Sequence, residues 1–127
     1  MLHEIKGVRQ ERGGAGRRRW FESEGLELVV WLDRAAAITG FQLCYDVGQG
    51  EHALTWREES GFAHNRVDSG DDTPLANRTP VLQPESPPVP WGKITQLFNQ
   101  RSKTLEPALQ QLIQDRLADR GAKDKRA

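Results

Sequence analysis

Five residues that could bind a metal or transfer a proton lie in the middle of the sequence: His52, His64, Asp46, Asp68 and Glu51. In a strand, the four-residue spacing of His64 and Asp68 puts both side chains on one side but more than about 12 Å apart, too far to share a metal. His52 and Asp46 flank one predicted turn and could approach each other. The sequence contains no His-x-His, HExxH or paired-cysteine pattern of the kind that marks a metal site. We therefore expect no metal, no cofactor and no catalytic residue, and our interpretation leans away from an enzyme.

The single cysteine, Cys44, excludes an internal disulfide and any zinc site that is built on paired cysteines. It lies inside an apolar run with no residue beside it that would favour a thiolate. We expect Cys44 to be a small buried hydrophobic residue and not a nucleophile.

A basic and aromatic run, RRRWF, covers residues 17–21. Its arginines could contact phosphates while Trp20 stacks on an unpaired base, as in single-strand binders. In a strand, however, Arg17, Arg19 and Phe21 share one side while Arg18 and Trp20 share the other. Residues 26–68 hold seven acidic against three basic side chains, although the whole chain has no net charge. Pairing with acidic neighbours (Glu22, Glu24, Glu27 or Asp33) therefore competes with nucleic-acid binding through Arg17, Arg18, Arg19 and Trp20.

Two alternating segments must position these side chains. Residues 26–33 carry aliphatic side chains at every second position, and residues 38–46 repeat the pattern, so the two predict a β-hairpin with one apolar side. Val29 and Trp31 fall on the opposite side. Either the sheet curls toward a barrel that buries both sides, or Val29 and Trp31 meet a partner across an interface.

The remaining chain divides by composition into one domain with five parts. We expect an edge strand and a flexible turn in 1–16, an antiparallel sheet in 17–68, a proline-rich linker in 69–90, two amphipathic helices in 91–120 and a disordered tail in 121–127. Apolar spacing predicts the helices, with a break at residues 103–106 before Pro107 and an end at Gly121. The predicted fold is α+β: an antiparallel meander of five or six strands, strongly twisted or partly closed, with both C-terminal helices packed on it.

Four phrases resemble a family of small uncharacterised bacterial proteins. They are RRRWF at residues 17–21, LVVWLD at 28–33, GFQLCYD at 40–46 and ALTW at 53–56. The resemblance covers residues 17–68, about half of the chain. It implies a bacterial cytoplasmic origin, no known activity and no additional site residue.

No apolar run approaches the roughly 20 residues that cross a bilayer, and the N-terminus lacks the apolar segment of a secretory signal. We expect a cytoplasmic protein with no membrane partner. The leading interpretation is a small non-catalytic interaction module, homodimeric through the sheet or bound to an unknown protein partner. The alternative is a nucleic-acid-binding module, and an enzyme with an unrecognised site comes third.

Overall fold

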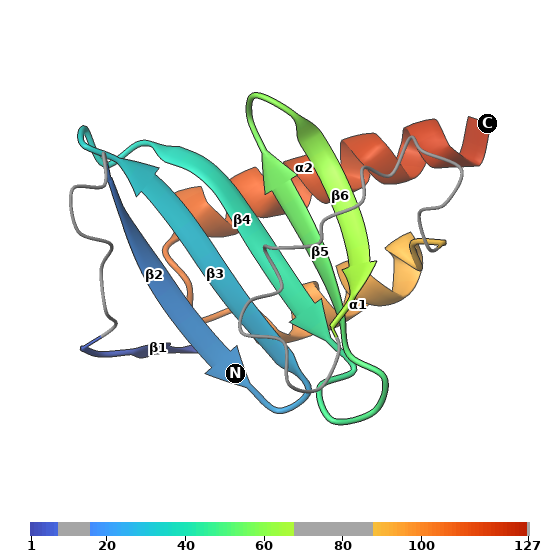
Figure 1. The fold of residues 1–127 in the computed structure, drawn as a ribbon, viewed down its shortest axis with the longest axis horizontal. Helices are drawn as coiled ribbons and strands as arrows, with labels where there is room; N and C mark the ends of the chain where they lie inside the picture. Colours follow the sequence, from blue (N-terminus) through green and yellow to red (C-terminus); the bar gives the residue numbers. More distant parts are fainter. Residues whose placement is uncertain (8–15, 68–87, 127) are drawn as a thin grey trace.

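The computed structural model of the chain describes residues 1–7, 16–67 and 88–126, and residues 120–126 as backbone only. Six strands form one antiparallel sheet in the order β1 to β6 (Figure 1). They are β1 (His3–Ile5), β2 (Gly16–Ser23), β3 (Leu26–Asp33), β4 (Ile38–Tyr45), β5 (His52–Arg57) and β6 (Gly61–Arg66). Helices α1 (Trp91–Arg101) and α2 (Pro107–Arg126) follow. The predicted α+β class and meander are confirmed.

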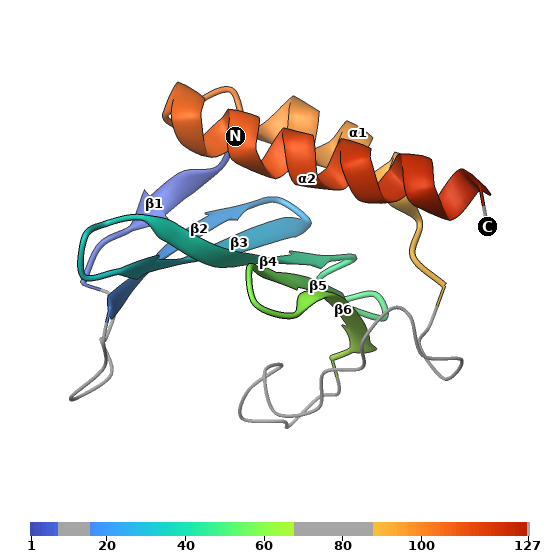
Figure 2. The same ribbon diagram turned by 90° about the horizontal axis from the view of Figure 1, so that it is seen from above.

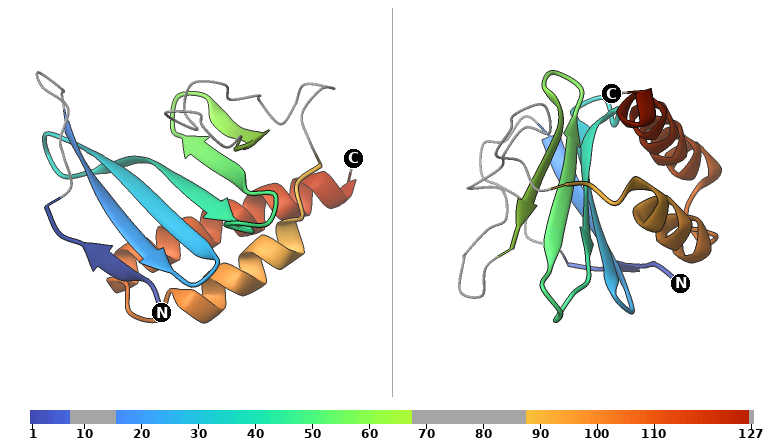
Figure 3. Two further views of the ribbon diagram at one scale, coloured as in Figure 1. Left: turned by 60° about the horizontal axis from the view of Figure 1, so that its bottom comes forward. Right: turned by 90° about the vertical axis from the view of Figure 1, so that its right-hand side faces the viewer.

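Both helices lie on one side of the sheet, as Figure 2 and the two views of Figure 3 show. We call the side under the helices the first face and the opposite side the second face. In the described sheet, β1 and β6 are the two edges and do not pair with each other, so the sheet is open. The sequence left two ways to cover the second face, closure of the sheet into a barrel or contact with a partner. The open sheet excludes closure into a barrel.

The first face carries the apolar core that the alternation predicted. Leu28, Val30, Phe41 and Leu43 are at most 1% exposed. The helices supply the other half of the core through Ile94, Phe98, Leu109, Ile113 and Leu117. Burying each such side chain stabilises the fold by roughly 1.5 to 3 kcal/mol.

The β3–β4 connection has no glycine, and Asp33 explains how it turns. One carboxylate oxygen, Oδ1, accepts hydrogen bonds from the backbone N–H groups of Ala35 at 2.8 Å and Ala37 at 2.9 Å. Ala36 then adopts a positive φ of 65°. An aspartate that binds amides two and four residues ahead is a local turn device, and it offsets the strain at Ala36.

The joint between the helices falls where the sequence predicted a break. Ser102 ends α1 through a hydrogen bond from its backbone N–H to the Phe98 carbonyl at 2.9 Å, and its buried hydroxyl accepts one from Gln110 Nε2 at 2.9 Å. The N-terminus is attached at the same place, because the Leu2 backbone N–H donates to the Arg101 carbonyl at 2.8 Å.

The predicted end of the second helix is wrong. Helix α2 continues through Gly121 to Arg126, so residues 121–126 are helical where a disordered tail was expected. A glycine inside a helix costs only about 1 kcal/mol relative to alanine, and the alanine, lysine and arginine residues that surround Gly121 favour helix.

Two predicted segments fall largely outside the described residues. They are the flexible turn before residue 16 and the linker, residues 69–90, of which the structure describes the last three positions. Neither α1 nor α2, as far as each is described, is long and apolar enough to cross a membrane.

Candidate interaction surface

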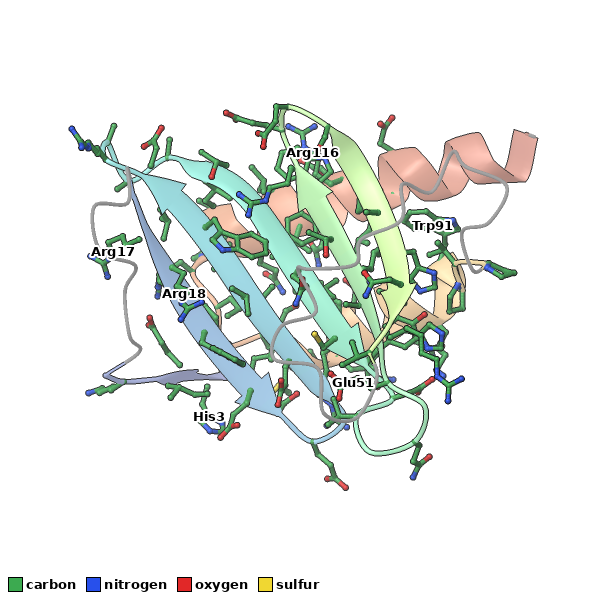
Figure 4. All side chains as sticks on the ribbon, in the orientation of Figure 1. His3, Arg17, Arg18, Glu51, Trp91 and Arg116 are labelled. Carbon is green, nitrogen blue, oxygen red and sulfur yellow. The ribbon has the colours of Figure 1, made fainter. Side chains whose placement is uncertain are left out.

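The strand register arranges the second face in three rows that cross β2 to β5. The basic row contains Arg18, Trp31, Gly40 and Arg57. The central row contains Trp20, Val29, Gln42 and Thr55. The acidic row contains Glu22, Glu27, Cys44 and Ala53, with Glu51 just before β5 at the same end. In Figure 4, Arg18 and Glu51 lie in front of the sheet toward opposite ends of the strands.

Trp31 lies close to its neighbours in the basic row. The Arg57 guanidinium carbon is 4.1 Å from the centre of the Trp31 ring, which is the geometry of a cation–π contact. Gly40 makes room for this pair, since a Cβ there would lie 3.3 Å from Trp31 Cε3, 2.9 Å from Arg57 Cδ and 2.6 Å from the Trp56 carbonyl oxygen. Trp31 is half-buried. The arrangement is therefore an aromatic ring with one guanidinium stacked on it and part of its surface exposed.

On β3, β4 and β5 the central row is already enclosed within one chain. Val29 is 7% exposed, Gln42 3% and Thr55 1%. The Thr55 hydroxyl donates to Gln42 Oε1 at 3.0 Å, and Gln42 Nε2 donates to Cys44 Sγ at 3.4 Å. Val29 was predicted as an interface residue together with Trp31, but its own exposed area is small. The half-buried side chains that rise beside it, Trp20 and Trp31, are better placed for contact.

The acidic row brings three carboxylates together. Burial raises the pKa of Glu27, and the like charges of Glu51 and Glu22 raise it further. At the edge of the row, His3 Nε2 lies 3.4 Å from a carboxylate oxygen of Glu22. Cys44 is buried in this row, as predicted, and burial raises the pKa of its thiol to about 12. A thiol that stays protonated at neutral pH is a poor nucleophile.

The basic and aromatic run divides between the two faces, as the alternation predicted. Arg18 and Trp20 point to the second face, whereas Arg17 pairs in register with Leu32 on the first. Arg19 also lies on the first face, 5.0 Å from the Phe21 ring centre, and it binds two carboxylates. Its guanidinium contacts Glu4 at 2.7 and 2.9 Å and Glu106 at 2.6 and 3.1 Å.

The partners of Arg19 therefore differ from the acidic neighbours that the sequence suggested. Hydrogen bonds from Arg19 lower the pKa of Glu4 and of Glu106. Through its bonds to Glu4 and Glu106, Arg19 connects β2 to β1 and to the residue just before α2, which is a structural role. Arg17, Arg18, Arg19 and Trp20 consequently do not form one continuous surface for a nucleic acid.

The histidines of the candidate proton-transfer set meet on the first face, at the end of the sheet near α1. Tyr45 Oη is 2.6 Å from Nε2 of the buried His64, and the rings of Tyr45, His64 and His52 are stacked at centre distances of 5.3 to 5.9 Å. Burial, and then the charge of Asp46, raise the pKa of Tyr45 to about 12, so this phenol keeps its proton at neutral pH while its hydroxyl is hydrogen-bonded to His64 Nε2. His52 Nδ1 bonds to the Gly50 carbonyl at 2.8 Å.

Asp46 does not approach His52 as a hydrogen-bond partner. Both of its carboxylate oxygens accept from Lys93 Nζ of α1, at 2.7 and 2.8 Å. Asp68 lies outside the described residues. Within the described parts of the chain, no three His, Cys, Asp or Glu side chains are grouped so as to hold a metal ion.

The residues that sequence reasoning missed are Arg57, Gly40 and Lys93. Gly40 was visible as a glycine inside a strand pattern, which signals a close approach of another group. Arg57 and Lys93 carried no local signal, because their partners Trp31 and Asp46 lie 26 and 47 residues away.

Comparison with known proteins gives no match: no protein-family model, no curated protein and no solved structure is similar to this chain.

Proposed function

We propose that this chain is a small non-catalytic interaction module that self-associates through the second face of its sheet. The observation that carries the proposal is the half-buried Trp31 with Arg57 stacked on it. Tryptophan and arginine are the side chains most enriched among residues that dominate the free energy of protein association. Here both are held in place by the sheet, so little conformational entropy is lost when a partner covers them.

The chemistry of the titratable groups supports a binding role over a catalytic one. The thiol of Cys44 and the phenol of Tyr45 each have a pKa raised to about 12, so both are protonated at neutral pH. Tyr45 and His64 are buried and bonded to each other, which favours a structural role for the pair. General acid–base catalysis works best with a group whose pKa lies near the working pH.

The position of the surface also supports the proposal. The helices occupy the first face and leave the second face on the other side of the sheet (Figure 3). An aligned second sheet is a common way to cover a sheet face, at a spacing of about 10 Å. The stacked side chains of Trp31 and Arg57 would lie between two sheets at such a spacing.

The test is molar mass by size-exclusion chromatography with light scattering, over a hundredfold range of protein concentration. We expect the wild-type mass to rise from monomer to dimer. Trp31→Ala should raise the dimer dissociation constant by about 30-fold, the effect of losing roughly 2 kcal/mol at a dominant contact. Arg17→Ala, an exposed change on the first-face side of β2, is the control and should leave the constant unchanged. A wild-type chain that stays monomeric throughout would refute the proposal.

A nucleic-acid module makes a different prediction. Its binding would weaken steeply with salt and would depend on Arg17 and Arg18 together. Because these two side chains lie on opposite faces and Arg19 is held by Glu4 and Glu106, we expect no salt-dependent binding of single-stranded DNA in a fluorescence titration.

A further inference from the structure

Charge on the second face is separated along the strand direction. Arg18 and Arg57 lie in the basic row, and Glu22, Glu27 and Glu51 lie at the opposite end. Rows four residues apart along a strand are roughly 13 Å apart, so the two ends of the face carry distinct fields. A partner for this face must present the opposite order: acidic groups against the basic row and basic groups against the acidic row.

The basic and acidic rows lie at equal distances from the central row, and β2 carries a charge at both positions. On β2, Arg18 and Glu22 each lie two residues from Trp20. On β3, Trp31 and Glu27 each lie two residues from Val29. A two-fold axis that crosses the strands over the central row would therefore exchange the basic row with the acidic row.

We infer that the partner is a second copy of this chain, related by a two-fold axis that runs across the strands over the central row. This inference rests on the proposed function and specifies its geometry. Closed two-fold dimers bury the same patch on both chains, and that patch must be complementary to itself. The second face meets this requirement for one axis only. An axis parallel to the strands would place acidic row on acidic row, whereas an axis across the strands places acidic row on basic row.

The axis specifies which residues meet. It places β2 of one copy opposite β2 of the other. Arg18 of each copy therefore faces Glu22 of the other copy. On β3, Trp31 faces Glu27 of the second copy. On β5, Arg57 faces the segment that carries Ala53 and Glu51. Charge pairs at a rim of this kind fix the register of two surfaces and suppress the wrong orientation.

The arrangement also agrees with the burial of the central row. Val29 and Thr55 are enclosed within one chain and need no partner. The second copy would contact partly exposed side chains, which are Trp20 in the central row and, on either side of that row, Arg18, Trp31, Arg57, Glu22 and Glu27. Its arginines would also bring positive charge to the three crowded carboxylates of the acidic row, where like charges raise the free energy of the separate chain.

A complementation experiment tests the axis. Arg18→Glu alone would place two carboxylates opposite each other, and Glu22→Arg alone would do the same with two guanidinium groups. Each variant should therefore raise the dimer dissociation constant at least tenfold. In an equal mixture of the two variants, both contacts become attractive again. The mixture should form heterodimers, detected by energy transfer between differently labelled chains, at close to the wild-type constant.

Two controls make the result specific. The pair Arg17→Glu and Glu24→Arg changes neighbouring charges outside the three rows and should leave the wild-type dimer intact, alone and mixed. Circular dichroism and thermal unfolding check that each variant is folded, and if Arg18→Glu does not fold, the exchange is repeated with Arg57→Glu and Glu51→Arg.

The outcomes separate the inference from the proposed function. Two folded variants that are monomeric alone and dimeric when mixed support the axis. A wild-type dimer that depends on Trp31 but shows no recovery in the mixture overturns the axis and leaves self-association through this face standing. A wild-type monomer at every concentration overturns both.

Discussion

Two tryptophans on opposite faces of the sheet have similar surroundings but differ in what covers them. Trp56 on the first face stacks on Phe41 at 5.6 Å, under the Arg116 guanidinium from α2 at 5.0 Å. Trp31 on the second face lies under Arg57 at 4.1 Å, and both come from the sheet itself. Each ring is half-buried. The difference is that a helix completes the surroundings of Trp56, whereas within the described residues no helix lies over Trp31.

The comparison extends to the whole of each face. The first face is apolar and stabilises the fold through close packing with the helices. The second face carries separated charges, hydrogen-bonded polar residues in its central row and a stacked tryptophan, and the proposed self-association rests on these features. Truncating buried apolar side chains of the first face should therefore lower the free energy of unfolding most, whereas truncating partly exposed side chains of the second face should chiefly alter association.

The largest effect is expected at Phe98, which is fully buried in α1 against the first face. Phe98→Ala removes the ring and leaves a cavity, so it should lower the free energy of unfolding by about 3 to 5 kcal/mol. Urea unfolding followed by circular dichroism measures the loss. Val47→Ala, at an exposed apolar side chain, is the control and should change stability by less than about 0.5 kcal/mol. A loss below about 1 kcal/mol for Phe98→Ala would contradict the assignment of the core.

The next effect is expected at Gly40 under Trp31. Gly40→Ala brings a methyl group to 2.6 Å from the Trp56 carbonyl oxygen, so the strand must shift and stability should fall by about 1 to 3 kcal/mol. The same variant should expose the Trp31 ring and change its fluorescence. Gly92→Ala in α1 is a matched control, because no atom lies within 4 Å of the added methyl group. It should be neutral or stabilising by up to about 1 kcal/mol.

A smaller effect is expected for the buried hydrogen bond between Tyr45 and His64. Tyr45→Phe keeps the ring but removes the hydroxyl that is hydrogen-bonded to Nε2 of a histidine that is 1% exposed. The loss should be about 1 to 2 kcal/mol, measured by urea unfolding at pH 7. If stability does not change, the hydrogen bond contributes nothing and the stack of rings alone holds this end of the sheet.

The smallest effect is expected at Glu27 on the second face. Its pKa in the folded chain is raised, chiefly by burial, above the ordinary value of 4.5. Such a group contributes stability that is present below the unfolded pKa and is lost as pH rises through the folded pKa. Glu27→Gln should therefore stabilise the chain at pH 7 by less than about 1 kcal/mol, and by less still at pH 4. Thermal unfolding at the two pH values checks the sign, and a variant that is less stable at pH 7 would contradict it.

Sequence patterns predicted the parts of this structure that depend on near neighbours. Alternation in residues 26–33 and 38–46 predicted the strands and the buried side, and Pro107 predicted where the second helix starts. These features follow from the two-residue period of a strand and from the missing N–H of proline.

The features that could not be predicted depend on contacts between distant segments. Arg19 and Glu106 are 87 residues apart, and the sequence offers nearer carboxylates that would satisfy the same charge. The Trp31 and Arg57 pair depends on the register of three strands, which an irregularity between Trp31 and Leu32 shifts by one residue. The end of α2 was missed because one glycine is a weak stop signal when helix formers surround it.

The central claim is that the second face meets another copy of the chain, and the two tryptophans allow it to be tested in one sample. Hydroxyl-radical oxidation of Trp31 and Trp56 would be measured by mass spectrometry across a hundredfold range of protein concentration. The account predicts that oxidation of Trp31 falls as concentration rises while oxidation of Trp56 stays constant. Equal oxidation of Trp31 at all concentrations, or protection of Trp56 instead, would contradict it.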